Sequence, residues 1–96
     1  MSDSRVASGA ALPERLTLAE AGATLELLGR ALAQNPATEV ALDASRLSVF
    51  DSSAVAVLLE LRRTLQVQGK TLRVEHWPQR LQALVALYGV SELLPA

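Results

Sequence analysis

The sequence contains no cysteine, a single histidine and few aromatic residues, which make up 3% of its 96 positions. Without cysteine there is no disulfide, no thiolate metal site and no cysteine nucleophile. One histidine and scattered carboxylates provide no metal-ligand spacing, so we expect no metal site. With so few aromatic side chains, the core must consist of Leu, Val and Ala.

The chain has neither a long cluster of basic residues nor a long run of apolar residues. The net charge is −1, and the longest basic cluster is Arg62-Arg63. This composition is poorly suited to counterion release, so we expect no nucleic-acid partner. No apolar run approaches the roughly 20 residues of a membrane span, and the first six residues lack the features of a signal peptide. We therefore expect a cytoplasmic protein without direct membrane insertion.

Half of the residues are hydrophobic and a fifth are charged, which predicts one globular domain over residues 1–96. Two short apolar pieces lie around Val6-Ala7 and from Leu12 to Leu16. Ser8-Gly9 and Pro13 interrupt them, so we predict two short strands joined by a turn.

A first helix is predicted after these strands. Thr17 and Glu20 have the spacing of a capping box, and Asn35-Pro36 ends the helix. Residues at helical spacing predict one stripe that faces a core. The stripe consists of Leu18, Ala21, Leu25, Leu28 and Leu32.

Two strands and a helix are predicted in the middle of the chain. Thr38–Asp43 contains the continuous apolar run Val40-Ala41-Leu42, which is typical of a strand covered on both faces. A second helix runs from about Ser53 to Val67 and stops at Gly69. Thr71–His76 alternates in polarity, which predicts a half-exposed strand. Its inward face would carry Leu72, Val74 and His76.

A third helix is predicted to begin at Pro78, which suits a first helical turn, and to end at Gly89. Its apolar stripe consists of Leu81, Leu84, Val85 and Tyr88. The tail from Val90 to Ala96 is expected to dock on the domain. Strands alternating with helices predict an α/β fold, with a mixed sheet of about four strands and helices packed against it.

Enzymatic chemistry has few candidate residues. A lone histidine such as His76, next to Trp77, is usually a packed residue with a satisfied hydrogen bond. Ser52 would meet it only through long-range folding. The sequence contains neither a glycine-rich phosphate loop nor a nucleophile elbow. We therefore expect no enzymatic activity and no cofactor.

Asp51, Ser52 and Ser53 stand together at the start of the second helix. Asp and Ser are favoured helix caps, but capping needs one such residue. The unpaired amides and the dipole at this end also attract anions, and a phosphate on Ser52 would add about −1.5 to −2 charges beside Asp51. Two interpretations therefore stay open: plain capping, with Asp51 as the cap, or a phosphorylation or partner-contact site at Ser52.

Two sides of the second helix are apolar. At 100° per residue, the core side consists of Ala54, Val57, Leu58, Leu61 and Leu65. A different side consists of Ser52, Val55, Ala56, Leu59 and Arg63. That second side either contacts the third helix or, together with Ser53, forms a surface for binding a partner protein.

Several of these segments together resemble the STAS family, the anti-sigma-factor-antagonist-like domains, over nearly the whole chain. They are the strand Val40–Asp43, the motif Asp51–Ala54, the apolar helix through Leu58-Leu59 and the strand from Leu72 to Glu75. The resemblance implies the STAS fold. It also implies that Ser52, which matches the first hydroxyl after the motif's aspartate, is the phosphorylation or partner-contact position.

Residues 78–95 are similar to the STAS subunits of Mla phospholipid-transport ABC complexes, the MlaB family. This resemblance implies a small non-catalytic subunit, peripheral at the inner membrane, that binds the ATPase subunit and through it the permease. Such complexes help to maintain the lipid asymmetry of a Gram-negative outer membrane. The wider STAS family implies an alternative, an anti-sigma-factor antagonist switched by phosphorylation at Ser52.

The motif departs from the family pattern at Ala54, where the family usually has glycine. Alanine is the better helix former by about 1 kcal/mol, so the helix does not suffer. A Cβ atom in the first turn would hinder close approach by a kinase active site. The departure therefore favours docking over a phosphorylation switch.

Overall fold

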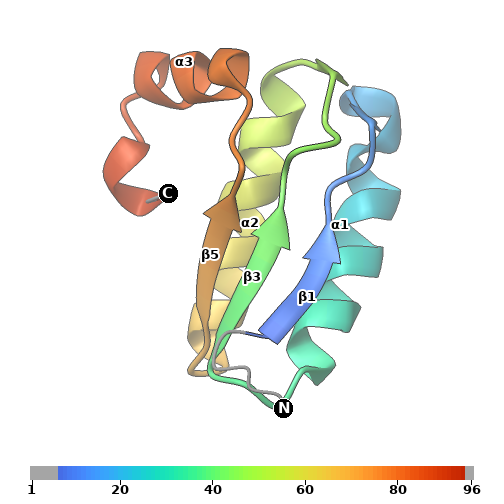
Figure 1. Ribbon diagram of the computed structural model, residues 1–96, viewed down its shortest axis with the longest axis vertical. Coiled ribbons are helices and arrows are strands. Elements are labelled where there is room, and N and C mark those ends of the chain that lie inside the picture. Colours follow the sequence, from blue (N-terminus) through green and yellow to red (C-terminus); the bar gives the residue numbers. More distant parts are fainter. Residues whose placement is uncertain (1–6, 95–96) are drawn as a thin grey trace.

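A computed structural model describes residues 7–94, and the side chains from residue 10 onward. Its strands and helices alternate along the chain, which confirms the predicted α/β class (Figure 1). The elements are β1 (Ala7–Ala11), β2 (Arg15–Leu16), α1 (Leu18–Gln34), β3 (Glu39–Asp43), β4 (Val49–Phe50), α2 (Ser52–Val67), β5 (Thr71–Glu75), α3 (Gln79–Leu87) and the 3-10 turn η1 (Ser91–Leu93).

The main sheet has the strand order β1-β3-β5, and both of its strand pairs are parallel. A second, two-stranded parallel sheet joins β2 to β4. Every strand pair in residues 7–94 is thus parallel, whereas the sequence predicts a mixed sheet. The reason is that α1 and α2 serve as the crossover connections between successive strands of the main sheet.

Both long helices cover the same face of the main sheet (Figure 1). The core lies between them and the sheet, with Leu58, Leu61 and Leu65 from α2 buried together with Val40 and Leu42. The opposite face carries Arg73, paired with Glu39 at 3.4 Å and Glu75 at 3.6 Å. Among the described residues, helices cover one face of β3; on the opposite face Ala41 is also buried, whereas Glu39 and Asp43 at the ends of the strand are partly exposed.

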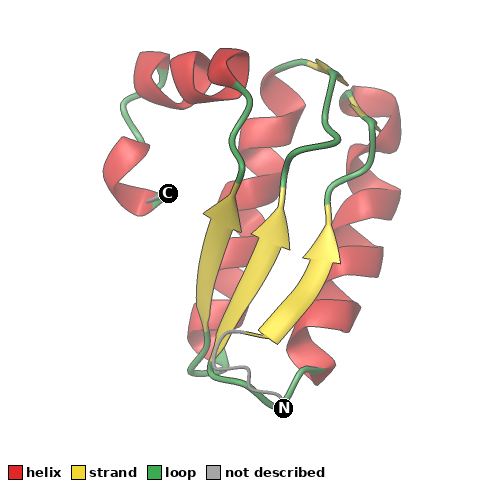
Figure 2. Cartoon of the chain, viewed as in Figure 1, coloured by secondary structure: helices red, strands yellow, loops and turns green. Residues whose placement is uncertain are grey.

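The N-terminal region forms two strands, but they belong to different sheets. β1 runs through Ser8 and Gly9, where a turn is predicted, and absorbs the glycine as an irregularity between Ser8 and Ala10. Val6 lies outside the described residues. The β2–β4 pair lies beyond the carboxyl ends of the main strands, close to the starts of α1 and α2 (Figure 2). The sequence pattern predicts no strand at β4.

The first helix begins with the predicted capping box. The Ala19 amide donates to the Thr17 hydroxyl at 3.3 Å, and the Thr17 amide donates to the Glu20 carboxylate at 2.8 Å. Hydrogen bonds from the Thr17 side chain and then its amide lower the pKa of Glu20. Leu18 is 77% exposed, contrary to its place in the predicted core stripe, because this first turn lies beyond the ends of the strands (Figure 1).

The second and third helices end at glycines in the left-handed region. Gly69 has a φ of 78°, and the following amide, of Lys70, donates to the Leu65 carbonyl at 2.8 Å. Gly89 has a φ of 70° and ends α3 in the same way. In the tail, Leu94 is buried while Leu93 is 40% exposed, so the predicted docking is confirmed for Leu94.

Candidate functional site

The start of α2 is held by the carboxylate of Asp51. Its Oδ1 accepts a hydrogen bond from the Ser53 amide at 2.8 Å, which makes Asp51 the N-cap of α2. Its Oδ2 accepts a hydrogen bond from the Leu18 amide, at the start of α1, at 3.3 Å. These bonds, led by the one from the Ser53 amide, lower the pKa of Asp51. One carboxylate thus serves the N-termini of both long helices.

Ser52 is the first residue of α2 and is exposed. Because Asp51 caps the helix, the Ser52 hydroxyl is not needed for capping. Ser53, by contrast, is half-buried, and its amide is the one bound to Asp51. Of the two serines, Ser52 therefore presents the group that a partner or a modifying enzyme can reach.

A shallow hollow of about 320 Å³ runs along the first half of α2, and we call it the α2 hollow. Four of the predicted partner-binding residues line it, together with Tyr88 at the end of α3. These lining residues are Ser52, Val55, Ala56, Leu59 and Tyr88. The structure thus gathers most of the predicted surface in one concave place and adds an aromatic residue to it.

A second hollow of about 510 Å³, the α3 hollow, adjoins the first and shares Ser52 and Tyr88 with it. α3 contributes Arg80, Ala83, Leu84 and Leu87 to its lining. Phe50 contributes from β4, and Asp51 from the N-cap of α2. Leu87 and Tyr88 remain 75% and 53% exposed. Adjacent exposed apolar side chains of this kind, bordered by polar groups, are typical of protein contact surfaces.

Arg80 carries the positive charge of the α3 hollow. Its guanidinium carbon lies 4.7 Å from the centre of the Phe50 ring, and its Nη1 donates to the Ser48 carbonyl at 3.4 Å. The cation–π contact and the hydrogen bond orient the side chain. With Asp51 on the same lining, the hollow presents one charge of each sign.

Three predicted partner-binding residues lie differently from expectation: Ser53 and Arg63 line neither hollow, and Val55 is buried. Val55 is only 3% exposed and belongs to the core, although it also contributes to the lining of the α2 hollow. Arg63 is exposed but lines neither hollow, and its Nε donates to the Glu60 carboxylate at 3.3 Å. Leu59, half-buried against the core, keeps the exposure that docking requires.

His76 is not part of the inward face of β5, which ends at Glu75. The chain turns at His76 with a φ of 59°, and the side chain is 67% exposed. Its Nδ1 lies 3.0 Å from the Asp43 carboxylate, which also accepts from the Ser45 amide. Hydrogen bonds from Ser45 and then from His76 lower the pKa of Asp43. The expected hydrogen bond of His76 is present, but the expected packing is not.

The structure also brings Tyr88 to the site. Its helical spacing predicts a core position with Leu81 and Val85, yet it is the C-cap of α3 and is exposed. The signal available in the sequence was its place directly before Gly89, at the end of the helix. Within residues 7–94, no group of three or more His, Asp and Glu side chains is arranged to hold a metal ion.

Comparison with known proteins identifies one family. The family model described as "Mlab, STAS domain" matches residues 3–95. No curated protein matches the chain. In the part of the chain that the structure describes, no helix has both the length and the apolar character needed to cross a membrane.

Proposed function

Because the chain belongs to the MlaB-type family of STAS domains, we propose that it is a non-catalytic subunit of an Mla-type phospholipid-transport ABC complex. In this proposal it binds the ATPase subunit, stabilises it in a competent form, and is linked to the permease through it. The protein is then cytoplasmic and peripheral at the inner membrane. Its complex maintains the lipid asymmetry of the outer membrane.

The α2 hollow is the observation that carries this proposal. Ser52, Ala56 and Leu59 follow one another along one side of α2, and Tyr88 closes the hollow from α3. A concave, mostly apolar surface of this size suits a protruding apolar side chain of a partner protein better than it suits a reaction. Leu59 and Tyr88 supply the buried contact area on binding, and Tyr is among the residues that most often dominate binding energy.

The charged groups beside the hollow fit the same role. Asp51 is fixed by the Ser53 and Leu18 amides, and Arg80 is fixed over Phe50. Because both side chains are already oriented, pairing them with a partner costs little ordering entropy. Charged groups at an interface rim contribute to orientation and association rate more than to affinity.

Purification of the complex from the native host tests the proposal. A tagged chain is expected to retain an ABC ATPase and its permease, and intact-mass analysis is expected to show no phosphate on Ser52. Recovery of an anti-sigma-type serine kinase with a phosphorylated Ser52 would instead establish the signalling alternative. A tagged Ser52→Tyr variant serves as the control, since it fills the hollow and should release the ATPase.

A further inference from the structure

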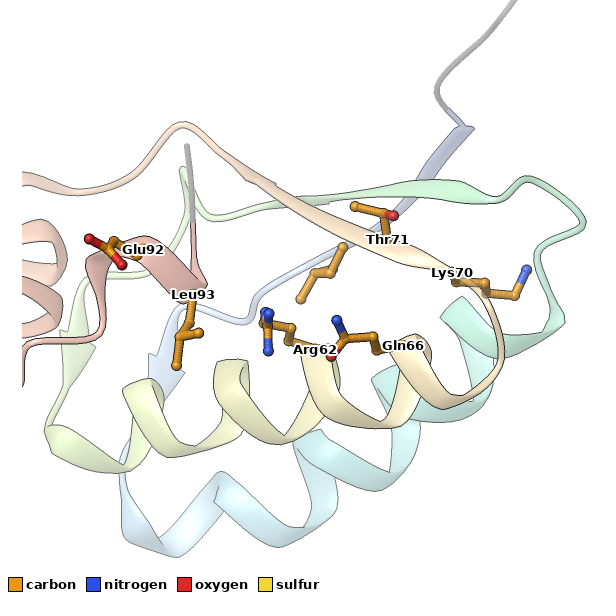
Figure 3. A pocket seen from close by; sticks show the side chains of 7 residues that line it. Arg62, Gln66, Lys70, Thr71, Glu92 and Leu93 are labelled. Carbon is orange, nitrogen blue, oxygen red and sulfur yellow. The ribbon is translucent and has the colours of Figure 1, made fainter.

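A third hollow, of about 180 Å³, lies between the second half of α2, the start of β5 and η1 (Figure 3). It shares no lining residue with the α2 and α3 hollows. Its volume is below the roughly 300–1,000 Å³ of typical ligand pockets. A ligand held here must therefore be small.

Two cationic side chains line this hollow, and they differ in their partners. Lys70 is engaged by the protein, because its Nζ donates to the carbonyls of Asn35 and Ala37. Arg62 is partly buried, and within residues 7–94 its guanidinium has neither a hydrogen bond to the protein nor an ion pair. Among the described residues, Arg62 therefore carries the positive charge of this hollow that no protein group pairs with.

The groups around Arg62 suit an oxyanion with a short apolar substituent. Figure 3 shows Arg62 and Gln66 rising from α2 toward β5, whereas the Thr71 side chain, which borders the hollow, extends on the other side of that strand. A guanidinium binds carboxylate and phosphate groups in a bidentate manner, and the Gln66 amide adds a further donor. Buried Leu72 and half-exposed Leu93 provide an apolar wall.

One residue that lines the hollow, Glu92, carries a negative charge that repels anions. Glu92 on η1 is exposed, and in Figure 3 Leu93 lies between it and Arg62. Its negative charge reduces the attraction of the hollow for anions, although solvent screens the effect. Neutralising Glu92 should therefore strengthen anion binding, which is the opposite of the effect of neutralising Arg62.

We propose that the hollow between α2, β5 and η1 binds a small oxyanion, a carboxylate or phosphate group with a short apolar substituent, through Arg62. This site is independent of the partner-binding surface on the first half of α2. Its occupancy can therefore be measured on the isolated full chain.

The test is a titration of the ¹⁵N-labelled full chain, followed by NMR, with sodium butyrate, sodium acetate and sodium phosphate at ionic strength held constant with sodium chloride. We expect saturable shifts at the Arg62 Nε–H group and at the Thr71 amide. Tighter binding of butyrate than of acetate indicates that the apolar wall takes part. Because acetate carries only a methyl group, the order of acetate and phosphate assigns the anionic group as carboxylate or phosphate.

Variants decide whether Arg62 holds the anion. R62Q should weaken binding about tenfold or more, and R62K, which keeps the charge but loses the bidentate geometry, should weaken it less. E92Q should strengthen it about twofold. R63Q removes the same charge from the neighbouring residue, which lines no hollow, and should leave binding unchanged. Shifts that do not saturate, or equal affinity in R62Q and the original chain, would overturn the proposal.

Discussion

The Leu18 amide donates a hydrogen bond to Asp51 Oδ2 at 3.3 Å, across 33 positions of the sequence. The other oxygen of the same carboxylate caps α2 through the Ser53 amide. Asp51 therefore does more than terminate one helix, because it fixes the starts of α1 and α2 relative to each other. The position of Ser52, and with it the α2 hollow, depends on this double contact.

Replacing Asp51 should destabilise the fold in a graded way. D51A removes both hydrogen bonds and should lower the melting temperature by about 4–8 °C. D51N keeps a capping oxygen but loses the second carboxylate oxygen, so its effect should be smaller. Thermal denaturation followed by circular dichroism measures both changes. Equal melting temperatures for D51A and the original chain would show that the double contact contributes nothing.

Stability should fall in acid. Hydrogen bonds lower the pKa of Asp51, Asp43 and Glu20 in the folded state, so the unfolded chain binds more protons at acid pH. The stabilisation from these carboxylates is complete above their ordinary pKa values of about 4 and is lost as the pH falls through the lowered values. Urea denaturation midpoints from pH 7 to pH 2 measure the decline. It should be shallower in D51N, and an unchanged slope in that variant would contradict this assignment.

Alanine substitutions at Val55 and Leu59 should differ in their effects on fold stability and on ATPase binding. Val55 is 3% exposed, so Val55→Ala should lower the free energy of unfolding by about 1.5–3 kcal/mol. Leu59 is half-buried, so Leu59→Ala should cost about 1 kcal/mol or less while still weakening binding of the ATPase. Urea denaturation and binding assays on both variants provide the comparison. A larger loss of stability in Leu59→Ala than in Val55→Ala would contradict the placement of Val55 in the core and of Leu59 at the binding surface.

Tyr88 should contribute to binding more than to folding. It is 53% exposed and lines both the α2 and the α3 hollow. Tyr88→Ala should weaken ATPase binding about tenfold or more, while its stability stays within about 0.5 kcal/mol of the original. Tyr88→Phe, which keeps the ring, should bind almost normally. Calorimetric titration against the purified ATPase gives the affinities, and full binding by Tyr88→Ala would exclude α3 from the interface.

Local signals in the sequence predict much of this fold. Thr17 and Glu20 mark the start of α1, Asp51 marks the start of α2, and Gly69 marks its end, each within one residue of its place in the structure. These features depend on hydrogen bonds and backbone geometry a few positions apart, and so they are readable from a single sequence. The family model over residues 3–95 agrees with the resemblance carried by the Asp51–Ala54 motif, its neighbouring strands and residues 78–95.

What the sequence alone could not predict depends on contacts between distant segments. Periodicity places Val55 and Leu59 on one side of α2, but only the packing of the folded chain shows that Val55 is buried whereas Leu59 stays partly exposed. The alternating polarity of β5 continues to His76 in the sequence, but the chain turns there with a φ of 59° and the ring lies beside Asp43. β4 has two residues and exists because of its pairing with β2, 34 positions earlier in register. The hydrogen bond between the Leu18 amide and Asp51 also joins distant segments of the chain.

The most direct test of the proposed docking role compares two leucines in a binding assay with the ATPase subunit. Leu59→Asp places a charge in the α2 hollow, whereas Leu27→Asp places the same charge on α1, where Leu27 is 68% exposed and lines neither the α2 nor the α3 hollow. Both variants should remain folded by circular dichroism. We predict that Leu59→Asp loses ATPase binding and that Leu27→Asp retains it. Retained binding in Leu59→Asp, or equal loss in both variants, would contradict the proposed docking surface.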